Sequence, residues 1–162
     1  MLNTLYEKMI DYEAECPKRI QHLVKVHSFA RHIGIMEGLD EHTQLVTEAA
    51  ALVHDIGIKP ALEKYGSDAG PLQEKEGIDP AREFLLETGF DKNDAERVAY
   101  LVGHHHTFSG IDGIDYQILV EADFLVNFYE NEMSDSQKTE CLHRIFKTAA
   151  GKRIAQVMFG LD

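Results

Sequence analysis

Apolar residues recur at intervals of three and four along most of this chain, which is the spacing of one face of an α-helix. Residues 18–38 carry one such stripe. The next pattern, over residues 40–57, is apolar around more than half of its circumference, so we expect a central and mostly buried helix there. Further helical patterns cover residues 79–89, 91–106, 115–131 and 136–159, the last of which holds one or two helices.

Proline and glycine separate these segments, and no run of β-branched residues alternates as a strand would. Asp40 and Asp91 stand where N-caps are expected. We therefore predict an all-α fold, a bundle of about six to eight helices. Because no repeat or linker divides the chain, residues 1–162 are expected to form a single domain that ends in the helices of 136–159.

The segment from Gly57 to Gly77 is rich in glycine, proline and charged residues. This composition predicts a long connection, of the kind that forms a lid or binding loop or contains a short helix. Asp79 and Pro80 then look like the N-cap and first residue of the next helix, although a helix that begins earlier and is kinked at Pro80 fits the same letters.

The charge balance narrows the choice of partners. The chain has 16 basic and 28 acidic residues, and 16 − 28 gives a formal charge of −12. Nucleic-acid polymers and anionic membranes are therefore not expected as partners, whereas a small anionic substrate is compatible, because one bound cation can invert the local potential. The absence of a long apolar run and the isolated Cys16 and Cys141 favour a cytoplasmic protein. The sequence is compatible with a homo-oligomer.

Three polar positions interrupt the apolar helix faces: His27, the doublet His54-Asp55, and Asp123. Taken alone, His27 is more commonly a satisfied core histidine, and Asp55 could cap a neighbouring backbone. A buried ionised carboxylate must nevertheless be paired or metal-bound. Two imidazoles and two carboxylates on three inward helix faces therefore indicate a site for Mn, Fe, Co, Ni, Zn or Mg.

These residues resemble the signature of the HD superfamily of metal-dependent phosphohydrolases. The order is His27, then His54-Asp55 within A-A-L-V-H-D-I-G, then the distant Asp123, and the resemblance covers roughly residues 20–130. It implies an HD-type helical bundle and a divalent metal ion bound by His27, His54, Asp55 and Asp123. It also implies hydrolysis of phosphate esters, with nucleotides or related small phosphorylated compounds as substrates.

The run His104-His105-His106 ends a predicted helix, where exposed imidazoles would suit the helix dipole. HD proteins that bind two metals carry a His-His pair at this stage of the chain, and the resemblance sets it on His104 and His105. Such proteins supply another histidine upstream, which this chain lacks between Asp55 and Gly103, although Glu74 or Glu76 could substitute. We expect one metal, with His104 and His105 near the substrate phosphate or at a weak second site.

In this interpretation Asp55 accepts a proton from metal-bound water, and His104, His105 or Arg31 stabilises charge on the phosphoryl group. Arg31 and Lys59 are candidate substrate contacts, each equally compatible with an ordinary surface role. The remaining histidines are interpreted as surface residues: His22, His32, His42 and His143.

Two functions of other classes stay open. The first is a di-iron oxygenase on the same fold, which requires the second metal. The second is a non-catalytic metal- or nucleotide-binding regulatory domain, which an assay on a substrate panel would separate from an enzyme.

Overall fold

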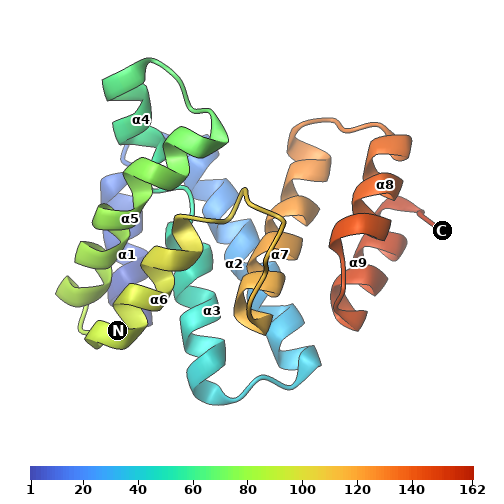
Figure 1. The fold of residues 1–162 in the computed structure, drawn as a ribbon, viewed down its shortest axis with the longest axis horizontal. Coiled ribbons are helices and arrows are strands. Elements are labelled where there is room, and N and C mark those ends of the chain that lie inside the picture. The colour runs from blue at the N-terminus through green and yellow to red at the C-terminus, as the bar shows by residue number, and fades with distance from the viewer.

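The computed structural model describes residues 1–162 and consists of nine α-helices joined by turns (Figure 1). The helices are α1 (Leu2–Tyr12), α2 (Pro17–Glu37), α3 (Glu41–Val53), α4 (Ile58–Tyr65), α5 (Gly70–Glu87), α6 (Lys92–Val102), α7 (Ile114–Glu130), α8 (Asp135–Ile145) and α9 (Ala149–Phe159). The predicted all-α class is confirmed. None of these helices combines the length and the apolar character needed to cross a membrane.

Local signals set the helix boundaries. The Asp40 carboxylate accepts hydrogen bonds from the backbone of His42 and Thr43 and so caps α3, and Asp91 caps α6 in the same way. Helix α2 begins at Pro17, a residue suited to the first helical position, and ends at Glu37, where its C-cap Gly38 adopts the left-handed conformation with φ 75°.

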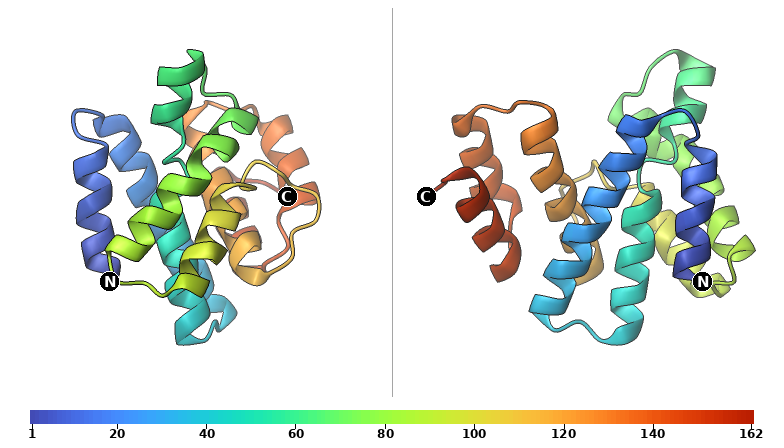
Figure 2. Two further views of the ribbon diagram at one scale, coloured as in Figure 1. Left: turned by 60° about the vertical axis from the view of Figure 1, so that its left-hand side comes forward. Right: turned by 180° about the vertical axis from the view of Figure 1, so that it is seen from behind.

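Helices α2, α3 and α7 form the centre of the molecule, with α1, α4, α5 and α6 on one side and α8 and α9 on the other (Figures 1 and 2). One cluster of 32 buried hydrophobic residues runs through this arrangement. Every residue of α3 from Val46 to Val53 is buried, as expected for the central helix. The polar groups at its C-terminal end are consequently held deep in the protein.

The segment after the doublet is not one long loop, because it contains the short helix α4, which was one of the alternatives for this segment. Helix α5 begins at Gly70 and continues through Pro80, which was the alternative to a helix start at Asp79 and Pro80. The buried residues of α5 lie four apart, at Gln73, Gly77, Ala81 and Leu85. Because only the last of these is strongly hydrophobic, the face carries little periodic signal in the sequence.

Gly57 and Gly77 allow the start of α4 to pack directly on α5. A Cβ atom at Gly57 would lie 2.1 Å from the carbonyl oxygen of Gln73 and 2.8 Å from the backbone nitrogen of Gly77. This close approach is possible only for glycine. It brings the N-terminal half of α5 against the turn that carries His54 and Asp55.

Candidate metal centre

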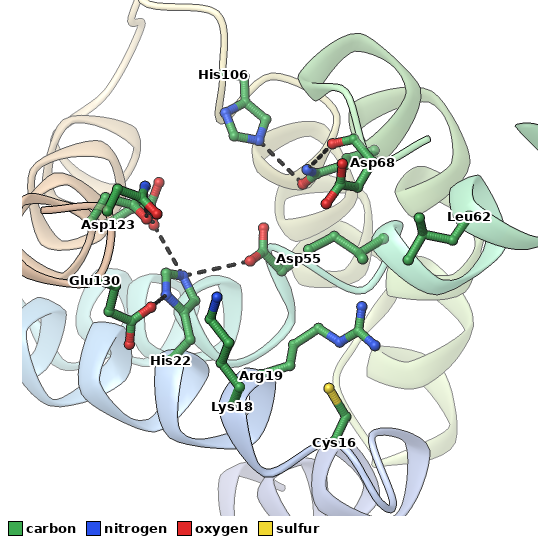
Figure 3. Close-up of a pocket in the computed structure, with 14 residues that line it drawn as sticks. Cys16, Lys18, Arg19, His22, Asp55, Leu62, Asp68, His106, Asp123 and Glu130 are labelled. Carbon is green, nitrogen blue, oxygen red and sulfur yellow. Dashed lines mark hydrogen bonds and ion pairs between the residues drawn. The ribbon is translucent and has the colours of Figure 1, made fainter. Parts of the chain in front are cut away.

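Four side chains converge where α2, α3 and α7 meet. His22 comes from the first half of α2, His54 and Asp55 come from the turn after α3, and Asp123 comes from the middle of α7. Figure 3 shows His22 between Asp55 and Asp123. His54 is fully buried and Asp123 is 7% exposed, so the hydrophobic core holds these polar groups in place.

The separations of the converging atoms match the coordination sphere of a metal ion. His22 Nε2 lies 3.1 Å from Asp123 Oδ1 and 3.3 Å from His54 Nε2, and His54 Nε2 lies 3.5 Å from Asp123 Oδ1. Asp55 approaches the two imidazoles at 3.5 and 3.6 Å. Ligand atoms about 2.1 Å from one ion are about 3.0–3.5 Å from each other. The mixed nitrogen and oxygen set therefore fits a divalent metal without rearrangement.

A second group adjoins the first through Asp55. His105 and His106, from the turn after α6, lie close enough to Asp55 to bind one ion together with it. His105 Nε2 is 3.4 Å from Asp55 Oδ1, and this buried nitrogen has no hydrogen-bond partner. An unpartnered buried nitrogen is costly unless it binds something. These residues could hold a second cation.

The outer ring nitrogens of the histidines are fixed by hydrogen bonds that leave Nε2 facing the centre. Nδ1 of His54 donates to the carbonyl of Ala51 at 3.0 Å, and Nδ1 of His105 donates to the carbonyl of Val102 at 2.7 Å. Nδ1 of His22 donates to Glu130 at 2.8 Å. Partners of this kind set the tautomer and ring orientation that metal binding requires.

The electrostatics of the cluster are those of a cation site. Burial favours the neutral imidazole of His22, but the hydrogen bond to Asp123 and the charge of Asp55 outweigh it and raise the pKa of His22 to about 9. Burial likewise opposes ionisation of Asp55 and Asp123, and the neighbouring imidazoles overcome it and lower both carboxyl pKa values. The two acidic groups are thus stabilised as anions and attract positive charge.

The structure corrects the expected place of His27. Its Nε2 lies 3.0 Å from Glu48 Oε2, on the face of α2 that packs toward α3, and it does not reach the doublet. His22, interpreted from the sequence as a surface residue, occupies the predicted position instead. Helix α2 buries two faces, and His22 continues the buried row of Val26 and Ala30. The apolar row that contains His22 could have indicated its burial from the sequence. The row through His27 is also apolar, so the sequence alone did not decide between the two histidines.

The structure also changes the predicted histidine pair and decides between the two glutamates. His104 turns away from the cluster: its Nδ1 donates to the carbonyl of Tyr100 at 2.7 Å, and its ring stacks on Tyr100. The histidine pair at the centre is therefore His105 and His106, one position later, because the chain leaves the helix at Gly103. Of the proposed glutamates, Glu74 accepts a hydrogen bond from the backbone of His106 at 2.9 Å. Glu76 pairs with Lys64, away from the centre.

Arg31 and Lys59 do not reach the site either. Arg31 has a side chain that is 59% exposed and lies beside Glu48, 3.8 Å from its carboxylate. Lys59 donates to the carbonyl of Tyr12 and lies over the Tyr12 ring. Both residues belong to neighbouring surfaces, because the helix faces that carry them point away from the centre.

An open cavity of about 510 Å³ leads to the candidate metal centre, of which His22, Asp55 and Asp123 line it. Its basic side chains are Lys18 and Arg19, in the first turn of α2, and both lie near Asp55 in Figure 3. Arg19 Nε donates to Glu13 Oε2 at 2.7 Å, while both Nη groups are free of partners within the chain. Sequence reasoning missed these two cations because they lie one helical turn before His22, which was itself interpreted as a surface residue.

Comparisons with known proteins agree with the fold and with this candidate metal centre. Residues 19–147 match the family model described as HD domain, a range that runs from the first turn of α2 past the end of α8. The chain belongs to the HD domain family. A solved structure of a predicted HD superfamily hydrolase from an uncultured Thermotogales bacterium is similar, with a TM-score of 0.65 and 25% identity, covering 98% of this chain and 83% of that one. A search of the curated proteins gave no match.

The family match confirms the resemblance found in the sequence and fits the metal-binding chemistry of the cluster. The matched range contains His22 as well as His54, Asp55 and Asp123. It also contains His105 and His106, so both candidate cation sites lie within the HD domain.

Proposed function

We propose that this HD-domain protein is a metal-dependent hydrolase of small phosphate esters, with nucleotides among the candidate substrates. The observation that carries the proposal is the pair of adjoining candidate cation sites, both within reach of Asp55, which open onto a cavity lined by Lys18 and Arg19. A cation site next to free cationic donors suits a substrate with a concentrated negative charge.

His22, His54, Asp55 and Asp123 would hold the principal metal ion. When bound, a divalent metal lowers the pKa of a coordinated water molecule and polarises a phosphoryl oxygen. Asp55 lines the cavity, so its carboxylate is placed to accept a proton from a water molecule on that side. Asp55 also reaches His105 and His106, whose site we propose as the weaker of the two.

Arg19 and Lys18 replace Arg31 and Lys59 as the proposed phosphate contacts. Arg19 is the better placed of the two, because the buried carboxylate of Glu13 holds its Nε and leaves the two Nη groups as a fork. A guanidinium fork matches two oxygens of a phosphate group. A preordered side chain also loses less conformational entropy when the substrate binds.

The test combines metal analysis with a substrate panel. The protein is purified without added metal, its bound metal is measured, and phosphate release is assayed with Mn, Co, Ni and Mg on nucleoside monophosphates, cyclic nucleotides and other phosphomonoesters. We expect metal-dependent turnover that Asp55→Asn abolishes while the helical circular dichroism spectrum stays intact. Metal-loaded protein that hydrolyses none of these compounds, or an Asp55→Asn variant with full turnover, would refute the proposal.

The adjoining sites also favour a second candidate, a di-iron oxygenase. Such chemistry would need two iron ions held close together, and Asp55 lies within 3.6 Å of ring nitrogens in both groups of candidate ligands. Two irons per chain together with substrate-dependent oxygen consumption would support this candidate. Nucleotide binding without turnover would instead support the non-catalytic regulatory domain.

A further inference from the structure

One wall of the cavity is a ladder of polar side chains along α7 and its C-cap residue. Asp123, Asn127 and the C-cap Asn131 follow one another at four-residue spacing, so they lie in one row along the helix. Asn127 Nδ2 donates to Asp123 Oδ1 at 2.8 Å, and Asn131 Nδ2 donates to Asn127 Oδ1 at 3.2 Å. All three line the cavity, so the ladder leads outward from the candidate metal centre.

The ladder leaves hydrogen-bonding groups free for a ligand. Each amide nitrogen uses one of its two N–H groups, and the side-chain oxygen of Asn131 has no partner. Across the cavity in Figure 3 lies Asp68, whose carboxylate makes no hydrogen bond or ion pair within the chain. Free donors and acceptors therefore face the same space from opposite sides.

The rest of the lining is also predominantly polar. Three of the 14 lining residues are hydrophobic, and these are Cys16, Ile58 and Leu62. The rings that reach the cavity are the imidazoles of His22 and His106, and both belong to the candidate cation sites. Stacking on aromatic rings is a common way to bind a nucleobase, whereas a hydroxyl group both donates and accepts a hydrogen bond.

We infer that the organic part of the substrate is a hydroxylated, non-aromatic group, so that the substrate is a sugar phosphate or polyol phosphate. This inference rests on the proposed phosphatase function and narrows its substrate class. The phosphate group lies toward the metal cluster and Arg19, and the hydroxyl groups bond to Asn131, Asn127 and Asp68.

The first test uses two substrates that differ at C1 of the pentose, where one carries a hydroxyl group and the other carries adenine. Ribose 5-phosphate and adenosine 5′-monophosphate present the same phosphate and pentose, and p-nitrophenyl phosphate reports on the chemistry with an aromatic leaving group. We expect kcat/KM for ribose 5-phosphate to exceed that for adenosine 5′-monophosphate by about tenfold. This factor combines one additional hydrogen bond to the sugar phosphate with the penalty that the nucleobase pays when it covers polar side chains of the cavity. A preference for the nucleotide would overturn the inference.

The second test removes the free amide. Asn131→Ala should lower the ratio of kcat/KM for ribose 5-phosphate to that for p-nitrophenyl phosphate by about three- to tenfold. Asn93→Ala, at an exposed position on α6, is the matched control and should leave the ratio unchanged. An unchanged ratio in Asn131→Ala would overturn the inference.

The outcomes separate this inference from the function on which it rests. Hydrolysis of the nucleotide and of p-nitrophenyl phosphate, but not of ribose 5-phosphate, would overturn the substrate class and leave the phosphatase proposal standing. No hydrolysis of any of the three compounds by metal-loaded protein would overturn both.

Discussion

Replacing His22 with alanine should weaken metal binding by about two orders of magnitude, while the same change at His27 should leave metal affinity unchanged. The two histidines lie five residues apart on one helix; His22 is buried and His27 is half-buried. Only His22 brings Nε2 to within 3.3 Å of His54 and 3.1 Å of Asp123. The pair of variants therefore tests the geometry of the centre directly.

The magnitude follows from the number of ligands. Binding of a divalent metal to a four-ligand protein site contributes about 10–16 kcal/mol, so the share of one ligand is about 3 kcal/mol. At 1.4 kcal/mol for each factor of ten, this corresponds to a dissociation constant about 100-fold higher. His27→Ala instead removes the partner of Glu48 and should lower the free energy of unfolding by about 1–3 kcal/mol.

Competition with a chromophoric chelator gives the dissociation constant, and the visible absorption of bound Co²⁺ reports the ligand set. Circular dichroism confirms that each variant is folded before it is titrated. The argument fails if His22→Ala binds Co²⁺ with wild-type affinity and spectrum, or if His27→Ala loses the metal although it remains folded.

Three further predictions concern the surroundings of the centre. Gly57→Ala should lower the free energy of unfolding by about 3 kcal/mol, since its Cβ would lie 2.1 Å from a backbone carbonyl oxygen of α5. Gly66 has open space around it, so Gly66→Ala should lower the free energy of unfolding by only about 1 kcal/mol, the cost of a left-handed φ. Urea unfolding measures both values. Arg19→Lys should raise KM for a phosphate ester about tenfold at unchanged metal content, and Lys59→Met should not; the reverse pattern would exclude Arg19 as the phosphate contact. Burial lowers the pKa of His27 below its ordinary value of 6.5, so on acidification the unfolded chain takes up a proton at this residue before the folded protein does. The free energy of unfolding of the wild type should therefore fall relative to that of His27→Gln as the pH drops below about 6.5. Urea unfolding at a series of pH values measures both, and a difference between the two proteins that does not change with pH would contradict this prediction.

The features of the site that the sequence indicates most clearly are those in which a charge conflicts with its local sequence. Asp55 and Asp123 stand in strongly apolar segments, so enclosure and a need for positive charge could be expected from the letters alone; Asp123 is buried and the side chain of Asp55 is 13% exposed. The caps of α3 and α6 were equally local. Each of these features depends on residues within a few positions of one another.

The parts that were wrong depend on how helices pack. Helix α2 has two buried faces, one toward α3 and one toward α7, and only the tertiary arrangement decides which of them meets the doublet. The pair His105 and His106 depends on a turn whose path a helical period cannot describe. Arg19 lies three residues before His22 on the same helix, so the interpretation of His22 as a surface residue also removed Arg19 from the predicted site.

Hydrogen bonding separates the buried charges that support the fold from those that serve the site. Glu121 is fully buried, yet its carboxylate accepts hydrogen bonds from Gln117 and from the backbone of Thr148, which ties α7 to the start of α9. Such a satisfied group stabilises structure.

Glu13 and His105 differ from Glu121, because each keeps a buried atom without a partner. An unsatisfied buried atom costs about 1–3 kcal/mol, so a chain retains it where it serves another role. Glu13 holds Arg19 at the cavity, and His105 faces Asp55. The two unsatisfied titratable groups thus lie behind the proposed phosphate contact and at the second cation site, which is where the proposed chemistry needs them.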